Sequence, residues 1–147
     1  MISGRAGARE DGTAMPLIVG LFAIAAGFVV VAAAATSLHL ERLRLLTVAD
    51  GAALAGAEAF RVADVRVEGD AVVPRLAGPA VSAAVGEYVA AADRSDLEGL
   101  TVVAADSTDG RSALVRLRAT WRPPIVGPLL PEGLPVEVTS TAAARFR

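Results

Sequence analysis

A long uncharged stretch, residues 15–38, constrains this chain more than any other feature of its sequence. It reads MPLIVGLFAIAAGFVVVAAAATSL, about 24 residues, which at about 1.5 Å per residue makes a helix of roughly 36 Å. The hydrocarbon core of a bilayer is about 30 Å thick. A helix that is apolar on every side can rarely be covered by a small domain. We therefore expect a single membrane-spanning helix.

A cleaved secretory signal is the alternative interpretation of this stretch. Ala33–Ala35 resembles a signal peptidase site, and cleavage after Ala35 would release a small secreted binding domain. The apolar region of such signals is only about 7–15 residues long, which favours a retained anchor. Two arginines flank the stretch on each side, so the positive-inside rule leaves its orientation open.

The helical pattern continues beyond the apolar stretch. Apolar residues recur at steps of three and four as far as Phe60, and charged residues occupy other faces. Thr13 is a candidate N-cap, and Pro16 then falls in the first turn, where its missing N–H removes no internal bond. The pattern predicts one helix over residues 13–63, with its transmembrane part at 15–38 and an amphipathic extension at 39–63.

Small residues mark candidate packing points along this helix. Ala23 and Gly27 lie four residues apart, a spacing that lets a partner helix approach closely in lipid. Gly51 and Gly56 each weaken the helix by about 1 kcal/mol relative to alanine. Because glycine also permits close contact, we interpret these two as points where the rest of the domain packs against the helix.

Residues 64–147 predict a small domain, and residues 1–12 predict a disordered tail or a removable leader. The predicted elements are a hairpin around residues 68–70, a helix over 79–93 and strands over 100–106, 113–122 and 136–146. Alternation along the strands gives the sheet one apolar face, which the two helices can cover. The expected fold class is α+β, with a long N-terminal helix packed on a small antiparallel sheet and one further helix.

Composition argues against several classes of function. The net charge of −2 does not suit nucleic acid, and the absence of cysteine excludes disulfides and thiolate sites. His39, the one histidine, cannot form an ordinary zinc site or a catalytic triad alone. Asp106 and Asp109 lack the further ligands of a calcium loop and indicate a turn. We expect no enzyme activity and no cofactor.

The stretch that follows the apolar helix carries a family resemblance. Residues 43–57 read LRLLTVADGAALAGA, and residues 9–12 read REDG. Both resemble TadE/TadG-like proteins of the Tad (Flp) pilus system, in which an AADAAALAGA-type run follows the membrane helix. The resemblance covers about residues 9–60, and it implies a pilin-like fold and a structural role as a minor pilin or pilus-assembly component.

The resemblance also implies a location, partners and a processing site. The N-terminus would be cytoplasmic and the C-terminal domain displayed outside the cell membrane, in contact with lipid and with other pilin-like or Tad assembly subunits. A prepilin peptidase would cleave between Gly12 and Thr13, although Leu17 stands where prepilins usually carry glutamate. Cleavage therefore stays open. Asp50 is a candidate partner for a basic group on a neighbouring subunit, or a solvated or N-cap-like side chain.

Overall fold

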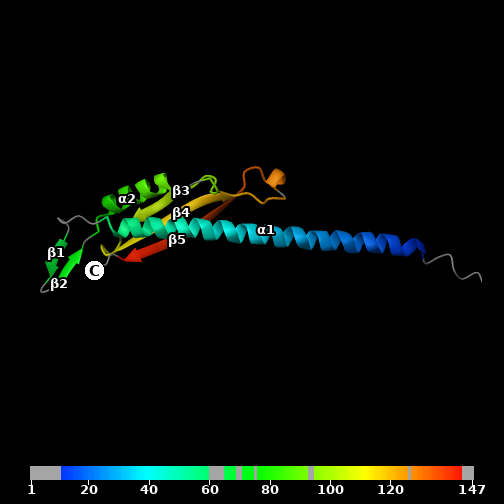
Figure 1. The fold of residues 1–147 in the computed structure, drawn as a ribbon, viewed down its shortest axis with the longest axis horizontal. Helices are drawn as coiled ribbons and strands as arrows, with labels where there is room; N and C mark the ends of the chain where they lie inside the picture. The colour runs from blue at the N-terminus through cyan, green and yellow to red at the C-terminus, as the bar shows by residue number, and fades with distance from the viewer. Residues whose placement is uncertain are drawn as a thin grey trace, which may run out of the picture.

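The computed structural model describes residues 11–59, 65–68, 71–74, 76–92, 95–125 and 127–143. Its elements are one very long helix, one shorter helix, a two-stranded hairpin and a three-stranded antiparallel sheet. The long helix extends well beyond the other described elements, which gather around its C-terminal half (Figure 1). The predicted α+β fold class is therefore confirmed.

Helix α1 spans Asp11–Ala57. It begins before Thr13, so the predicted N-cap is wrong, and Pro16 lies inside the helix rather than in its first turn. Helix α1 also ends before residue 63, because its buried face ends at Ala57 and the chain turns there, with the Ala59 N–H donating to the Gly56 carbonyl at 3.2 Å. Phe60 lies outside the described residues.

The main sheet has the order β3-β4-β5, and both pairs of strands are antiparallel. Its strands are β3 at Thr101–Asp106, β4 at Ser112–Trp121 and β5 at Leu134–Ala143. Strand β4 is central and pairs with β5 along its whole length, from Ser112 opposite Ala143 to Trp121 opposite Leu134. The predicted last strand began two residues late, and residues 144–147 lie outside the described residues.

Two smaller elements complete the fold. The predicted hairpin is formed by β1 at Val65–Glu68 and β2 at Ala71–Pro74, beyond the C-terminal end of α1 (Figure 1). Helix α2 spans Gly78–Ala91, close to the predicted range. Proline at its second position has no N–H to lose there, which suits the start of a helix.

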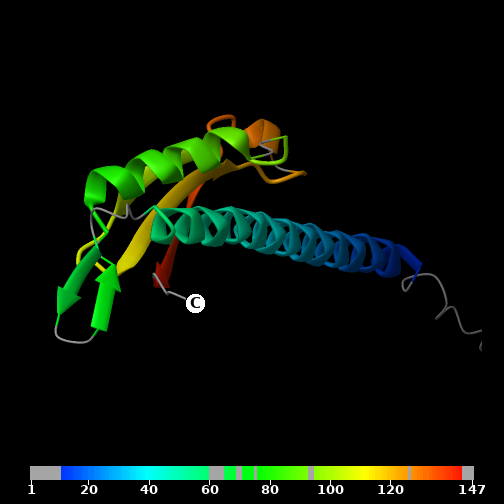
Figure 2. The ribbon, with the colours of Figure 1, turned by 60° about the vertical axis from the view of Figure 1, so that its left-hand side comes forward.

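The core lies between the sheet and the two helices. Helix α1 packs on β4 and β5, and α2 packs on β3 and on α1 (Figure 2). The alternation predicted for β4 is confirmed, because its inward side chains are all buried: Ala113, Val115, Leu117, Ala119 and Trp121. The first four of these form one cluster with Val81, Val85 and Val89 of α2 and Leu45, Ala49, Ala52, Ala53 and Ala57 of α1.

The other face of the sheet is polar and self-paired. Arg118 forms an ion pair with Glu137 across β4 and β5, with its Nε at 2.7 Å from Oε1. Arg116 donates to Thr139 Oγ1 at 3.3 Å, and Arg122 pairs with Glu98 at 2.9 Å. These three arginines therefore lie on a solvated face, and two of their charges are paired with carboxylates within the chain.

Candidate functional site

The N-terminal half of α1 is the most unusual surface of the molecule. Every residue from Ala14 to Val29 is exposed, although nearly all of these side chains are apolar. Leu17 and Met15 are each 74% exposed, and Phe22 is 76% exposed. Helix α1 is long and apolar enough to cross a membrane, and its most hydrophobic part is not buried by the described residues. An apolar surface of this size indicates a partner or an apolar medium.

Small residues in this half leave the helix surface open. Ala23 is exposed, and a Cβ added at Gly27 would meet no atom within 4 Å. The same holds for Gly20, about two turns earlier. These positions contact nothing in the described part of the chain, so their small size serves no packing need within it.

The two halves of α1 meet at a polar link. The indole Nε1 of Trp121, at the end of β4, donates to Ser37 Oγ at 3.2 Å. Trp121 is 7% exposed, so the link holds the end of the sheet against the helix. We did not expect this contact from the sequence. Its signals were a serine inside an otherwise apolar run and the only tryptophan at a strand end.

Partial covering of α1 begins about two turns before this link. Val30, Ala33, Ala34 and Ser37 are partly buried, whereas their neighbours at 31, 32, 35 and 36 are exposed. Spacings of three and four residues place the covered side chains on one face of the helix. The domain therefore touches α1 within the apolar stretch, and not only along its amphipathic half.

The glycines of the amphipathic half lie in close contacts. A Cβ at Gly51 would lie 2.0 Å from Tyr88 Oη, and a Cβ at Gly56 would lie 3.1 Å from both Ala113 Cβ and Val81 Cγ1. Gly51 thus admits the Tyr88 ring of α2, and Gly56 lets α1 approach β4 and α2. Tyr88 itself is 40% exposed, so its ring covers Gly51 from the solvent side.

Asp50 has a partner within the chain. Its Oδ1 accepts a hydrogen bond from Ser140 Oγ of β5 at 2.5 Å, and both side chains lie at the helix–sheet boundary. Ser140 was not expected to hold it, because the two residues are distant in sequence. The contact uses one carboxylate oxygen and ties α1 to the edge strand β5.

The candidate processing site lies in the first turn of α1. Gly12 and Thr13 are both within the helix, and nothing is described of their side chains. A peptidase that cleaves there would act at the helix N-terminus. The predicted leader, residues 1–10 in particular, lies outside the described residues.

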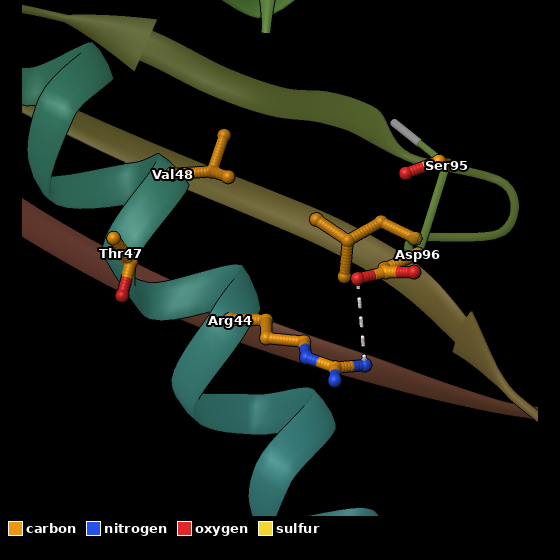
Figure 3. A pocket seen from close by; sticks show the side chains of 6 residues that line it. Arg44, Thr47, Val48, Ser95 and Asp96 are labelled. Atoms are coloured by element: carbon orange, nitrogen blue, oxygen red, sulfur yellow. Dashed lines mark ion pairs between the residues drawn. The ribbon is translucent and has the colours of Figure 1, made fainter. Parts of the chain in front are cut away.

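An open cavity lies between α1 and the loop after α2. It has a volume of about 250 Å³ and is lined by Arg44, Thr47, Val48, Ser95, Asp96 and Leu97. Arg44 Nη1 and Asp96 Oδ2 face each other across it at 3.9 Å (Figure 3). Both charges are more than half exposed, and the volume is below that of ordinary ligand sites. The cavity offers a weak surface ion pair over an apolar floor, not a binding site for a defined small molecule.

Two titratable groups of the described residues have shifted pKa values, and neither belongs to a metal-ligand cluster. No cluster of three metal-ligating side chains occurs among the described residues, and His39 is exposed on α1. The Asp109 carboxylate accepts the Arg111 and Ser112 backbone N–H groups at 2.9 and 2.7 Å, which lowers its pKa and completes a turn. Burial raises the pKa of Glu41, one turn beyond Ser37 on α1, and Arg44 partly offsets that effect.

Comparisons with protein-family models, with characterised proteins and with solved structures gave no match for this chain. The arrangement of its residues therefore has to indicate its role. What the structure presents is an exposed apolar helix, a polar link at its middle and a small domain fixed to its other half.

Proposed function

We propose that this protein is a structural, single-pass membrane component of a Tad/Flp-type pilus assembly or secretion system, with its small domain outside the cell. One observation carries the membrane part of the proposal. The same helix is exposed on every side from Ala14 to Val29, where it is apolar, and buries one face under the sheet and α2 where it is amphipathic. Each large exposed apolar side chain forgoes about 1.5–3 kcal/mol of burial in water, which a bilayer would supply.

The pilus part rests on the resemblance of residues 9–60 and on architecture. A long N-terminal helix whose second half packs on an antiparallel sheet is the layout expected of a pilin-like subunit. Such a subunit acts by presenting a domain and by packing against neighbours, so it needs no catalytic group. The exposed small residues Ala23 and Gly27 give helices of neighbouring subunits a place to approach closely in lipid.

N-terminal sequencing of the mature protein from its native cells tests the proposal. A start at Thr13 would support prepilin processing, and an intact Met1 would support a retained anchor. A start at Thr36 would replace both with the secreted-domain alternative. Detection of the chain in a sheared filament fraction, or neighbouring genes for a secretion ATPase, would support the pilus assignment. A native chain that is soluble and monomeric without detergent would refute the anchor.

Orientation can be measured because the chain has no cysteine of its own. A Thr108→Cys variant places a thiol in the exposed turn after β3, and a Ser3→Cys variant places one before α1. We expect a membrane-impermeant maleimide to label intact cells at position 108 but not at position 3. The reverse pattern would overturn the proposed topology.

A further inference from the structure

The loop between β4 and β5 has an apolar surface that the fold does not cover. Residues 123–131 read PPIVGPLLP and carry no charge. Ile125 is 54% exposed and Leu130 is 40% exposed, and Leu134, at the start of β5, is 45% exposed. A loop at a domain surface is usually polar, so three exposed large aliphatic side chains in one short connection indicate a function.

The position of this loop along α1 identifies what covers it. Trp121, the last residue of β4 before the loop, donates a hydrogen bond to Ser37 within the apolar stretch. The loop, with the short helix η2 at Gly127–Leu129, projects from the strand ends toward the apolar half of α1, away from the hairpin (Figure 1). The covered face of α1 begins at Val30, about 10 Å along the axis before Ser37. The loop therefore lies at the level where an anchored helix would leave the bilayer.

The backbone of the loop suits an apolar medium. Prolines at 123, 124, 128 and 131 have no N–H to satisfy. Three further N–H groups donate within the loop: Gly127 to the Pro123 carbonyl at 2.8 Å, Leu130 to Gly127 at 2.9 Å and Gly133 to Leu130 at 3.0 Å. Fewer free donors lower the penalty for withdrawing a loop from water.

We propose that the β4–β5 loop is a second membrane contact, which inserts Ile125 and Leu130 into the acyl–headgroup boundary of the bilayer that α1 crosses. The inference rests on the proposed membrane span. Its consequence is a fixed tilt of the outer domain, because a helix alone leaves the domain free to rotate and lean, whereas a second contact beside it does not. Charge resumes at both ends of the loop, at Arg122, which is paired with Glu98, and at the exposed Glu132.

Single cysteines carrying an environment-sensitive NBD fluorophore test the contact in the full chain. The protein is reconstituted in vesicles of phosphatidylcholine and phosphatidylglycerol, with labels at Ile125→Cys, Leu130→Cys, Phe22→Cys and Thr108→Cys. We expect the labels at 125 and 130 to be quenched by a nitroxide placed shallow in the acyl chain, and at least threefold less by aqueous iodide than the label at 108. The label at 22 reports the span, and the label at 108 reports water.

The outcomes separate the two proposals. If positions 125 and 130 are quenched by iodide like position 108 while position 22 is shielded, the span stands and the loop contact is wrong. If position 22 is also open to iodide, the proposed anchor fails. Shielding of 125 and 130 from both quenchers would show that protein covers the loop, which overturns the lipid contact. Cooperative unfolding followed by Trp121 fluorescence checks each fold, and Leu134→Cys replaces a variant that fails this check.

Discussion

The two halves of α1 are built from similar residues but are used in opposite ways. Leu21 in the first half is 68% exposed, whereas Leu45 in the second half is fully buried. Gly27 faces open space, whereas Gly56 is enclosed by Ala113, Val81 and Val85. The difference lies in what the rest of the chain supplies: a sheet and a second helix for residues 45–57, and nothing from the described residues for 14–29.

The comparison teaches that helix formation and helix burial are separate matters in this protein. The helix itself continues without a break from Asp11 to Ala57, with only Pro16 unable to donate a backbone hydrogen bond. Only the second half draws its stability from packing within the chain, because tertiary contacts there bury apolar area. The first half depends on its surroundings, and matched substitutions in the two halves can measure that difference.

Leucine truncation should give the largest contrast. Leu45→Ala removes a fully buried side chain and should lower the free energy of unfolding of the domain by about 2–5 kcal/mol. Leu21→Ala should change it by less than about 0.5 kcal/mol, since that side chain is exposed. Both changes nearly preserve helix propensity. Urea unfolding in detergent micelles, followed by Trp121 fluorescence, measures both. Equal losses would contradict the division of α1.

Enlarging a glycine should give the next largest contrast. Gly56→Leu places a side chain against Ala113, Val81 and Val85, where overpacking should cost about 1–3 kcal/mol despite the gain in helix propensity. Gly27→Leu meets no atom in the chain and should leave domain stability unchanged. The same unfolding assay applies. A change in oligomer size for the Gly27 variant alone would sharpen the comparison, because it would place an intermolecular contact on the exposed half.

Removal of the Ser37 hydroxyl, which accepts the hydrogen bond of Trp121, should give a smaller effect. Ser37→Ala removes the acceptor of the Trp121 indole and should cost about 0.5–1.5 kcal/mol. Thr36→Ala is the matched control, since its hydroxyl donates only to the Ala32 carbonyl in its own helix, at 2.9 Å. The Trp121 emission maximum should shift in the Ser37 variant and stay fixed in the Thr36 variant. An unchanged Ser37 variant would mean that the link does not hold the sheet to the helix.

The pH dependence of stability that comes from Glu41 should be the smallest effect. Burial raises the pKa of Glu41 above its ordinary 4.5, so its ionised form opposes folding above the folded pKa and the penalty vanishes at lower pH. Glu41→Gln should stabilise the domain at neutral pH, within the ~0.5 kcal/mol usual for surface changes, and have no effect below pH 4.5.

Asp109 provides a control of opposite sign. Backbone hydrogen bonds lower its pKa, so its contribution is present above its ordinary value of 3.8 and is lost as the pH falls through the folded value. Asp109→Asn should therefore destabilise at neutral pH and lose its effect in acid. Urea unfolding at several pH values measures both variants. Parallel profiles for Glu41→Gln and Asp109→Asn would contradict these assignments.

Sequence patterns predicted most of the secondary structure because local physics decides it. The alternation from Ala113 to Trp121 specified both the strand and its buried face. Successive side chains of a strand point to opposite faces, so the apolar set marks the face that is buried. The boundaries of α1 were predicted less well. Its end depends on where the sheet stops covering it, at Ala57, and this information lies in residues far away in the sequence.

The features of the candidate site were likewise predicted only in part from the sequence. Hydropathy identified the apolar stretch, and the small size of glycine made Gly51 and Gly56 candidate contacts. It could not show that Tyr88 fills the space at Gly51, that Ser140 takes an oxygen of Asp50, or that Trp121 bonds to Ser37. Each of these pairs joins residues that no helical or strand period relates, so only the folded chain brings them together.

By itself, the sequence determined that this protein has an uninterrupted apolar helix followed by an α+β domain, because propensity and periodicity act over a few neighbouring residues. The tertiary structure decided how far the domain reaches along that helix. It sets the end of β4 against Ser37 and directs the β4–β5 loop toward the side of the apolar half (Figure 1), since these positions follow from the packing of β4 and β5 on α1.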